Sequence, residues 1–154
     1  MADGINKNTI KEEDGESIEK RNEIIRIFRK YARLGLTECT LNPIQIYKKI
    51  DVLCASHRSM LDMLAVYDTL RLLELNEDRD TLESIFVVYL DGRAHRLTKH
   101  EMGRRVSALA SKCYCDERTV YRRLKKAREL YAKIRKQEGL ITDGAYSEKF
   151  NFQK

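Results

Sequence analysis

The sequence contains few residues that interrupt helices: one proline and seven glycines in 154 residues. Hydrophobic residues make up 42% of the chain and charged residues 35%, which together with so little proline favours an all-α protein. No apolar run approaches the roughly 20 residues that a membrane-spanning helix needs. The first 20 residues also lack the apolar core of a signal peptide. We therefore expect a soluble protein that stays in the cytoplasm.

Signatures of catalysis and of cofactor binding are missing as well. The chain has no glycine-rich phosphate loop, no GxSxG and no HExxH. His57, His95 and His100 are scattered, without a nucleophile or carboxylate at a matching spacing. The sequence therefore predicts a protein that is not an enzyme and that has no cofactor.

The four cysteines do not form the pattern of a disulfide framework or of a common zinc site. A cytosolic protein has little reason to oxidise its cysteines. Cys113 and Cys115 form a CxC pair, whereas common zinc sites use CxxC. These two could share a metal with His95 or His100, but Cys115 stands where an apolar side chain of a turn normally enters the core. We expect no bound metal.

Positive charge is concentrated in one part of the chain. The net charge is +6, but residues 93–138 carry 15 Lys and Arg against 5 Asp and Glu, an excess of +10. The other residues together carry 15 basic and 19 acidic side chains, a net charge of −4. A localised basic segment is typical of a nucleic-acid-binding surface.

The same segment has the pattern of a helix-turn-helix, in which a tight break separates two helices. Thr98 and Glu101 have the spacing of a capping box, which predicts a helix from about Lys99. Apolar residues then follow at helical steps and share one face: Met102, Val106, Leu109 and Ala110.

A second helix is expected from about Glu117, because Asp116 can cap its free N–H groups. Its apolar residues recur at steps of three and four, so they form one stripe that packs on the first helix. This stripe consists of Val120, Leu124, Ala127, Tyr131 and Ile134. A helix of this kind fits the major groove of B-form DNA, where Arg can donate two hydrogen bonds to guanine.

The outward side of the second helix supplies the residues that we expect to contact DNA. Side chains near the start of such a helix reach deepest into the groove. We predict base contacts from Glu117, Arg118, Thr119, Tyr121 and Arg122. Flanking cations neutralise phosphates, and we predict phosphate contacts from Arg104, Arg105, Lys112, Arg123, Lys125, Lys126 and Arg128. The alternative is a solvated basic face on a structural helix.

The run ALASKCYCDERTVYRRLKKARELYAKI resembles the helix-turn-helix of sigma-factor region 4, and most closely that of small phage regulators of the RinA and ArpU type. The run LESIFVVYLDG is similar to the helix that leads into region 4. Tyr114 departs from the pattern, because many such motifs have glycine at this turn position, and it predicts a different turn geometry. The matching residues are Ala110, Asp116, Arg118-Thr119-Val120 and Lys125-Lys126-Ala127.

The resemblance implies a transcription regulator encoded by a phage or mobile element, with RNA polymerase as a candidate partner. No region-2-like segment that would melt a promoter is visible in the sequence, which favours an activator or adaptor over a complete sigma factor. Because a single module rarely binds DNA tightly, we also expect a homodimer that reads two half-sites.

The N-terminal half is expected to be helical. Ser56 either caps a separate helix or lies within an unbroken one. The run IFVVYL has the β-branched and aromatic residues of a strand, but no partner strand is visible, so we predict a helix. The expected helices are Ser17 to Leu34, Pro43 to about Cys54, 60–75 and Arg79 to Leu90.

Two of these helices carry further expectations about burial. Residues 60–75 are apolar around much of the helix, which predicts a central core helix rather than a dimer interface. On the first helix we expect a solvated side with Arg21, Arg26, Arg29, Lys30 and Arg33. Its buried side should comprise Ile18, Ile24, Ile25, Phe28, Tyr31 and Leu34.

These observations divide the chain into a disordered arm at 1–15, a helical region for the core or for dimerisation at 16–76, a helix-turn-helix domain at 77–138 and a tail at 139–154. They predict an all-α, sequence-specific regulator of transcription that binds double-stranded DNA. Two alternatives are a non-enzymatic helical interaction protein and the DNA-binding small subunit of a recombinase or terminase.

Overall fold

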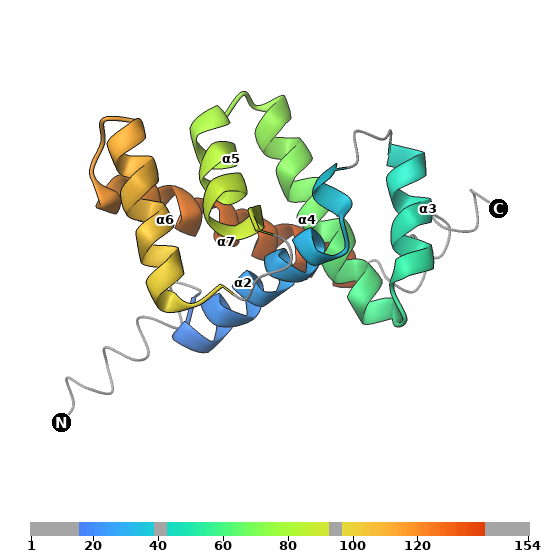
Figure 1. Cartoon of the computed structure of the whole chain (residues 1–154). Helices are drawn as coiled ribbons and strands as arrows, with labels where there is room; N and C mark the ends of the chain where they lie inside the picture. Colours follow the sequence, from blue (N-terminus) through green and yellow to red (C-terminus); the bar gives the residue numbers. More distant parts are fainter. Residues whose placement is uncertain (1–15, 39–42, 93–96, 141–154) are drawn as a thin grey trace, which may run out of the picture.

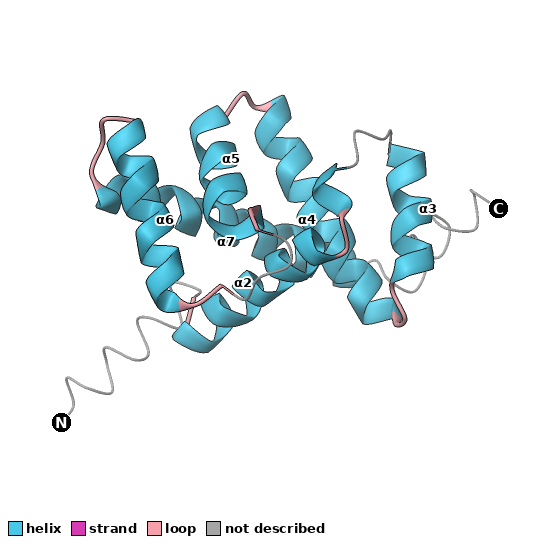
Figure 2. Cartoon of the chain, viewed as in Figure 1, coloured by secondary structure: helices cyan, strands magenta, loops and turns pink. Residues whose placement is uncertain are grey.

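The computed structural model describes residues 16–38, 43–92 and 97–140. Within these ranges the chain is helical and contains no β-strand (Figure 2), which confirms the all-α prediction. The predicted arm at 1–15, residues 141–154 of the predicted tail, and Cys39 and His95 lie outside the described residues. The elements are α2 (Ile18–Arg33), η1 (Leu36–Glu38), α3 (Pro43–Leu53), α4 (His57–Leu75), α5 (Arg79–Ile85), η2 (Phe86–Leu90), α6 (Lys99–Lys112) and α7 (Glu117–Leu140).

The long helix α7 organises the arrangement, because α4, α5 and α6 all pack against it. Helix α2 packs on α4 and on η2, which continues α5. Figure 1 places the α6–α7 turn at one end of the molecule and α3, which contacts α4, at the other. The predicted helix-turn-helix therefore lies at an end of the molecule, backed by the other helices.

One hydrophobic core runs through the regions on both sides of residue 76. The Phe28 ring of α2 lies 5.8 Å from the Tyr89 ring of η2 and 5.5 Å from the Tyr131 ring of α7, measured between centroids. The predicted boundary between 76 and 77 falls in the α4–α5 turn, but the core continues across it. The two predicted regions are thus one packed unit.

Most helix starts follow from the residue that precedes them. At each start a side-chain oxygen accepts the backbone N–H three residues later, which satisfies a group that the helix itself leaves free. The Ser56 cap shows that α3 and α4 are separate helices, the first of the two alternatives left open. The four capping residues are Ser17, Ser56, Asp78 and Thr98.

Burial confirms part of the predicted core and corrects part of it. Helix α4 is a core helix, since residues such as Met63, Leu64 and Val66 are fully buried. Ile18, expected on the buried side of α2, is 65% exposed because it lies in the first turn, at the edge of the body. Arg29 was expected in solvent but is 6% exposed.

Arg29 is buried because it binds the C-terminal end of η2. Its two terminal nitrogens donate to the carbonyls of Tyr89 and Asp91 at 2.7 Å and of Gly92 at 2.8 Å. Carbonyls at a helix end have no partner within the helix and carry partial negative charge, so a cation is favourable there.

A second arginine, from α6, binds the same end. The Arg105 guanidinium donates to the carbonyls of Val88 and Asp91, each at 3.0 Å. The arginine clamp, defined here as Arg29 and Arg105 on the end of η2, therefore joins α2 and α6 to one site.

Replacing Arg29 by Met should lower the free energy of unfolding by about 3 kcal/mol or more, because one buried and two partly buried carbonyls lose a donor while the apolar stem remains. Chemical denaturation of the two proteins measures this difference. Arg26→Met on the same helix is the matched control, since Arg26 is exposed, and it should change stability by no more than about 0.5 kcal/mol. Equal effects of the two substitutions would contradict the clamp.

Candidate nucleic-acid interface

The turn between α6 and α7 closes the first helix with two backbone hydrogen bonds. The N–H of Cys115 donates to the carbonyl of Ala110 at 3.0 Å, and that of Tyr114 to Ser111 at 3.3 Å. This pair is the Schellman arrangement, which requires a left-handed residue just after the helix. Tyr114 takes that conformation with φ of 55°. The turn thus has the left-handed geometry that glycine commonly supplies, although Tyr114 led us to expect a different one.

Asp116 starts α7 as predicted. Its carboxylate accepts the backbone N–H of Thr119 at 2.9 Å and the Thr119 hydroxyl at 3.0 Å. The Thr119 N–H and hydroxyl lower the pKa of Asp116 below its usual value, so the cap is charged near neutral pH. Because the Thr119 hydroxyl already donates to Asp116, its predicted base contact would require that bond to be shared or broken.

The inner side of α7 is packed as the periodicity predicts. Val120, Leu124 and Ala127 are fully buried and Tyr131 is 2% exposed. Ile134 is partly buried against the same core. These contacts fix the rotation of the helix about its axis, and with it the side that faces outward.

The outer side carries a row of side chains that we call the open stripe: Arg118, Tyr121, Arg122 and Lys125. All four are exposed, with Tyr121 at 42%. In the described parts of the chain no hydrogen bond or ion pair engages them. The steps of three, one and three residues place them on one face of the helix. Glu117, another predicted base contact, is exposed beside them.

Other cations of this segment pair with what we call the acidic row: Asp78, which caps α5, and Asp80 and Glu83 within α5. The ammonium of Lys126 lies 2.5 Å from an Asp78 carboxylate oxygen, and a guanidinium nitrogen of Arg123 lies 3.6 Å from Asp80. The hydrogen bond from Lys126 is the main cause that lowers the pKa of Asp78. These pairs lie between α7 and the start of α5.

The third pair of the row lies at the end of α6. Lys112 is 3.2 Å from Glu83, which also accepts from the thiol of Cys113 at 3.8 Å. Burial, more than the neighbouring Glu83, raises the pKa of the Cys113 thiol, which keeps it protonated near neutral pH. A protonated thiol is a poor metal ligand. In the described ranges no three His, Cys, Asp or Glu side chains gather as a metal site would require.

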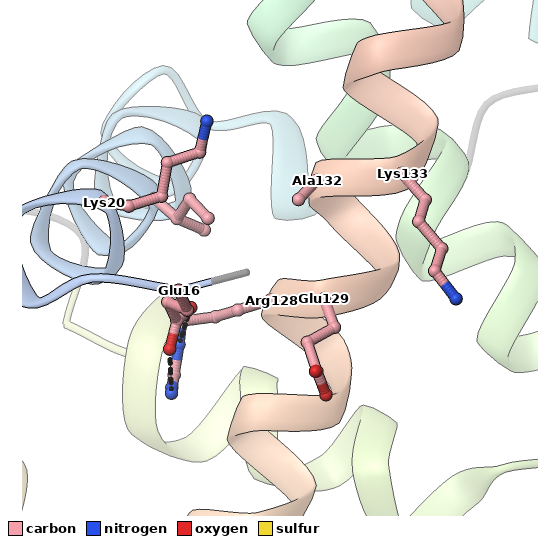
Figure 3. Close-up of a pocket in the computed structure, with 7 residues that line it drawn as sticks. Glu16, Lys20, Arg128, Glu129, Ala132 and Lys133 are labelled. Atoms are coloured by element: carbon pink, nitrogen blue, oxygen red, sulfur yellow. Dashed lines mark hydrogen bonds and ion pairs between the residues drawn. The ribbon is translucent and has the colours of Figure 1, made fainter. Parts of the chain in front are cut away.

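Arg128 is inside the protein rather than on the exposed side of α7. Its guanidinium donates to both Glu16 carboxylate oxygens, at 2.9 and 3.0 Å, and to the Tyr89 hydroxyl at 2.7 Å. Figure 3 shows Arg128 and Glu16 paired in the wall of a cavity between the start of α2 and α7, which has a volume of about 180 Å³. Lys20, Glu129, Ala132 and Lys133 line the cavity around it.

Two predicted phosphate contacts are therefore wrong. Arg128 is 6% and Arg105 is 9% exposed, and both guanidiniums are hydrogen-bonded within the fold. The other predicted phosphate contacts stay predictions, and they differ in availability. Lys125 has no ion pair in the described chain, whereas the remaining four lie in ion pairs with acidic side chains: Arg104, Lys112, Arg123 and Lys126.

Sequence reasoning missed the acidic row and the clamp. The acidic row could have been found, because Asp78, Asp80 and Glu83 are three acidic residues within six positions that precede the basic segment. Such a cluster indicates ion pairs with the basic segment. Nothing local distinguishes Arg29 from its solvated neighbours, because its partners lie 60 or more positions along the chain.

Comparison with protein-family models, with curated proteins and with solved structures gives no match for this chain. Across the described helices, none combines the length and the apolar character that crossing a membrane requires. The functional proposal therefore depends on the geometry of α6, α7 and the turn between them.

Replacing Tyr114 by Gly should raise the free energy of unfolding by about 1 kcal/mol, because glycine adopts the left-handed conformation without steric cost. Thermal or chemical denaturation measures the change. Tyr114→Ala is the matched control, since it removes the ring but keeps the Cβ, and it should be near neutral. If alanine stabilises as much as glycine, the ring and not the backbone is the cause.

Hydrogen bonds from Arg104 and then Arg105 lower the pKa of Glu101 to about 2, below the value of about 4.3 for an unfolded glutamate. The stabilisation from this carboxylate is therefore present above about pH 4.3 and is lost as the pH falls through about 2. Wild-type protein should exceed Glu101→Gln in melting temperature at pH 6, and the difference should disappear near pH 2.

Melting curves from pH 6 to pH 2 test this prediction. Glu74→Gln on α4 is the control, because the exposed Glu74 carboxylate has no cationic partner in the described chain. A gap between wild type and Glu101→Gln that stays constant over this range would show that the ion pairs do not stabilise the fold.

Proposed function

We propose that this chain is a non-enzymatic, sequence-specific transcription regulator that binds double-stranded DNA with the N-terminal half of α7. The observation that carries the proposal is the open stripe, in which three cations and one aromatic ring lie exposed on one helix face without partners in the described chain. Cations that served only to stabilise the fold would be paired, as those facing α5 are.

The dimensions of α7 suit the major groove. An α-helix with its side chains is about 10–12 Å across and the groove is about 12 Å wide. Arg118, Tyr121 and Arg122 lie in the first two turns of α7, where side chains reach base edges. Lys125 lies one turn further along and is suited to a phosphate.

The rest of the fold supports this role by holding α7 in place. The inner side of α7 is buried in the core. Lys126 and Arg123 also form ion pairs with acidic side chains at the start of α5. A rigid recognition helix loses little conformational entropy on binding, which leaves more of the contact energy for affinity.

The proposal includes two partners besides DNA: the resemblance to phage regulators implies RNA polymerase, and the weak binding expected of a single module favours a second copy of the chain. We propose RNA polymerase as a protein partner, action in the cytoplasm, and a homodimer that reads two half-sites. A dimer also suits the exposed apolar side chains of α3, since Val52 is 83% and Ile44 is 52% exposed at the end opposite the α6–α7 turn (Figure 1).

The same apolar side chains favour a second candidate, a helical interaction protein whose functional surface is the N-terminal half. Heparin chromatography separates the two, because a scaffold face would release heparin at low salt and a DNA-binding face would not. Copurification with a large catalytic partner would instead indicate the small subunit of a recombinase or terminase.

Replacing Arg118 or Arg122 by Ala should weaken binding to a selected DNA site by about 1–3 kcal/mol, and Lys125→Ala should weaken all DNA sequences by a similar factor. Anisotropy titrations on the selected and on a scrambled duplex, at several salt concentrations, measure both effects. Arg26→Ala on α2 is the control, as it removes an exposed arginine away from the open stripe.

Wild-type affinity should also fall steeply as salt rises. Binding that does not depend on salt, or equal losses for Arg26→Ala and Arg122→Ala, would refute DNA binding through the open stripe. Equal losses on both duplexes for all variants would refute the assignment of base contacts.

A further inference from the structure

The arginines of α6 and α7 divide into two groups. Seven arginines lie on these helices, and five of them donate to or pair with carboxylates or backbone carbonyls of the protein: Arg104, Arg105, Arg123, Arg128 and Arg135. Arg118 and Arg122 alone among the seven have no such bond in the described chain. Two guanidiniums on the open stripe are therefore available to a ligand.

We propose that Arg118 and Arg122 each read a guanine, so that a bound half-site contains two G·C pairs no more than about two base steps apart. This inference rests on the proposed function and names the bases that it recognises. A guanidinium has a planar fork of donors that matches the O6 and N7 acceptors of guanine in the major groove.

The spacing of the two arginines sets the spacing of the bases. Four residues of α-helix rise about 6 Å, and successive base pairs are separated by about 3.4 Å. Two side chains one helical turn apart on a helix that lies along the groove therefore face base pairs about two steps apart.

The other side chains near the open stripe favour G·C over A·T pairs. Asn and Gln are the side chains that pair with adenine in the major groove, and α7 has neither before Gln137. Glu117, exposed in the first turn, can accept from the amino group of cytosine. The Thr119 hydroxyl is already bonded to Asp116. The chemistry of this face therefore matches guanine and cytosine edges.

Selection of bound duplexes from a random pool with the full chain is the first test. The enriched motif should contain two G·C pairs within about two steps. Arg118→Ala should lose the preference at one of these positions and Arg122→Ala at the other, whereas Arg26→Ala should select the wild-type motif.

Base analogues in the selected duplex are the second test. Replacing each of the two guanines with 7-deazaguanine removes the N7 acceptor and should weaken wild-type binding about tenfold or more. The same replacement should have little effect on the variant that lacks the corresponding arginine. Inosine keeps O6 and N7 but lacks the minor-groove amino group, so it should change affinity less than about twofold.

The outcomes separate this inference from the proposed function. A motif made only of A·T pairs, or losses as large with inosine as with 7-deazaguanine, would overturn guanine readout while DNA binding stands. A chain that shows no salt-dependent binding to any duplex would instead overturn the proposed function. Preservation of both guanine preferences in Arg118→Ala and Arg122→Ala would assign the readout to other residues.

Discussion

The carbonyl end of η2 is the site on which the arrangement of the helices depends. Arg29 from α2 and Arg105 from α6 converge there and both donate to the carbonyl of Asp91. Burial lowers the pKa of Arg29, and the nearby positive charge of Arg105 lowers it further. Placing two cations side by side is therefore unfavourable in free energy. The carbonyls offset this cost, because those of Val88 and Tyr89 would otherwise be buried without these donors. The clamp thereby attaches α6 to the other helices.

Attachment of α6 and burial of the inner side of α7 together decide which cations remain accessible. The local charge excess of +10 overstates the free charge of this segment, since carboxylates at Asp78, Asp80 and Glu83 pair with three of its cations. An exposed ion pair contributes little to stability. The main consequence of the acidic row is that it occupies three cations and leaves those of the open stripe without a partner in the described chain.

Local features of the sequence predicted most of the secondary structure. Caps such as Thr98 and Asp116 act on N–H groups three residues away, and the apolar stripe that begins at Val120 has the helical period, so neither depends on the rest of the fold. The π-helical form of η2 was not predicted, because the apolar run IFVVYL gives no local signal that distinguishes a π-helix from an α-helix. The left-handed turn at Tyr114 was not predicted either, since a non-glycine residue gives no local signal for it.

The sequence by itself determined where the helices begin, which face of α7 is apolar and where positive charge accumulates, because these properties follow from hydrogen bonds and periodicity within a few turns. Only the tertiary structure decided which cations face solvent. Arg26 and Arg29 lie one turn apart on α2, yet one is exposed and the other is buried. Likewise, Lys125 has no partner among the described residues, whereas Arg128 binds Glu16, 112 positions earlier in the chain. Such partners are brought together by packing, and no local pattern of residues encodes them.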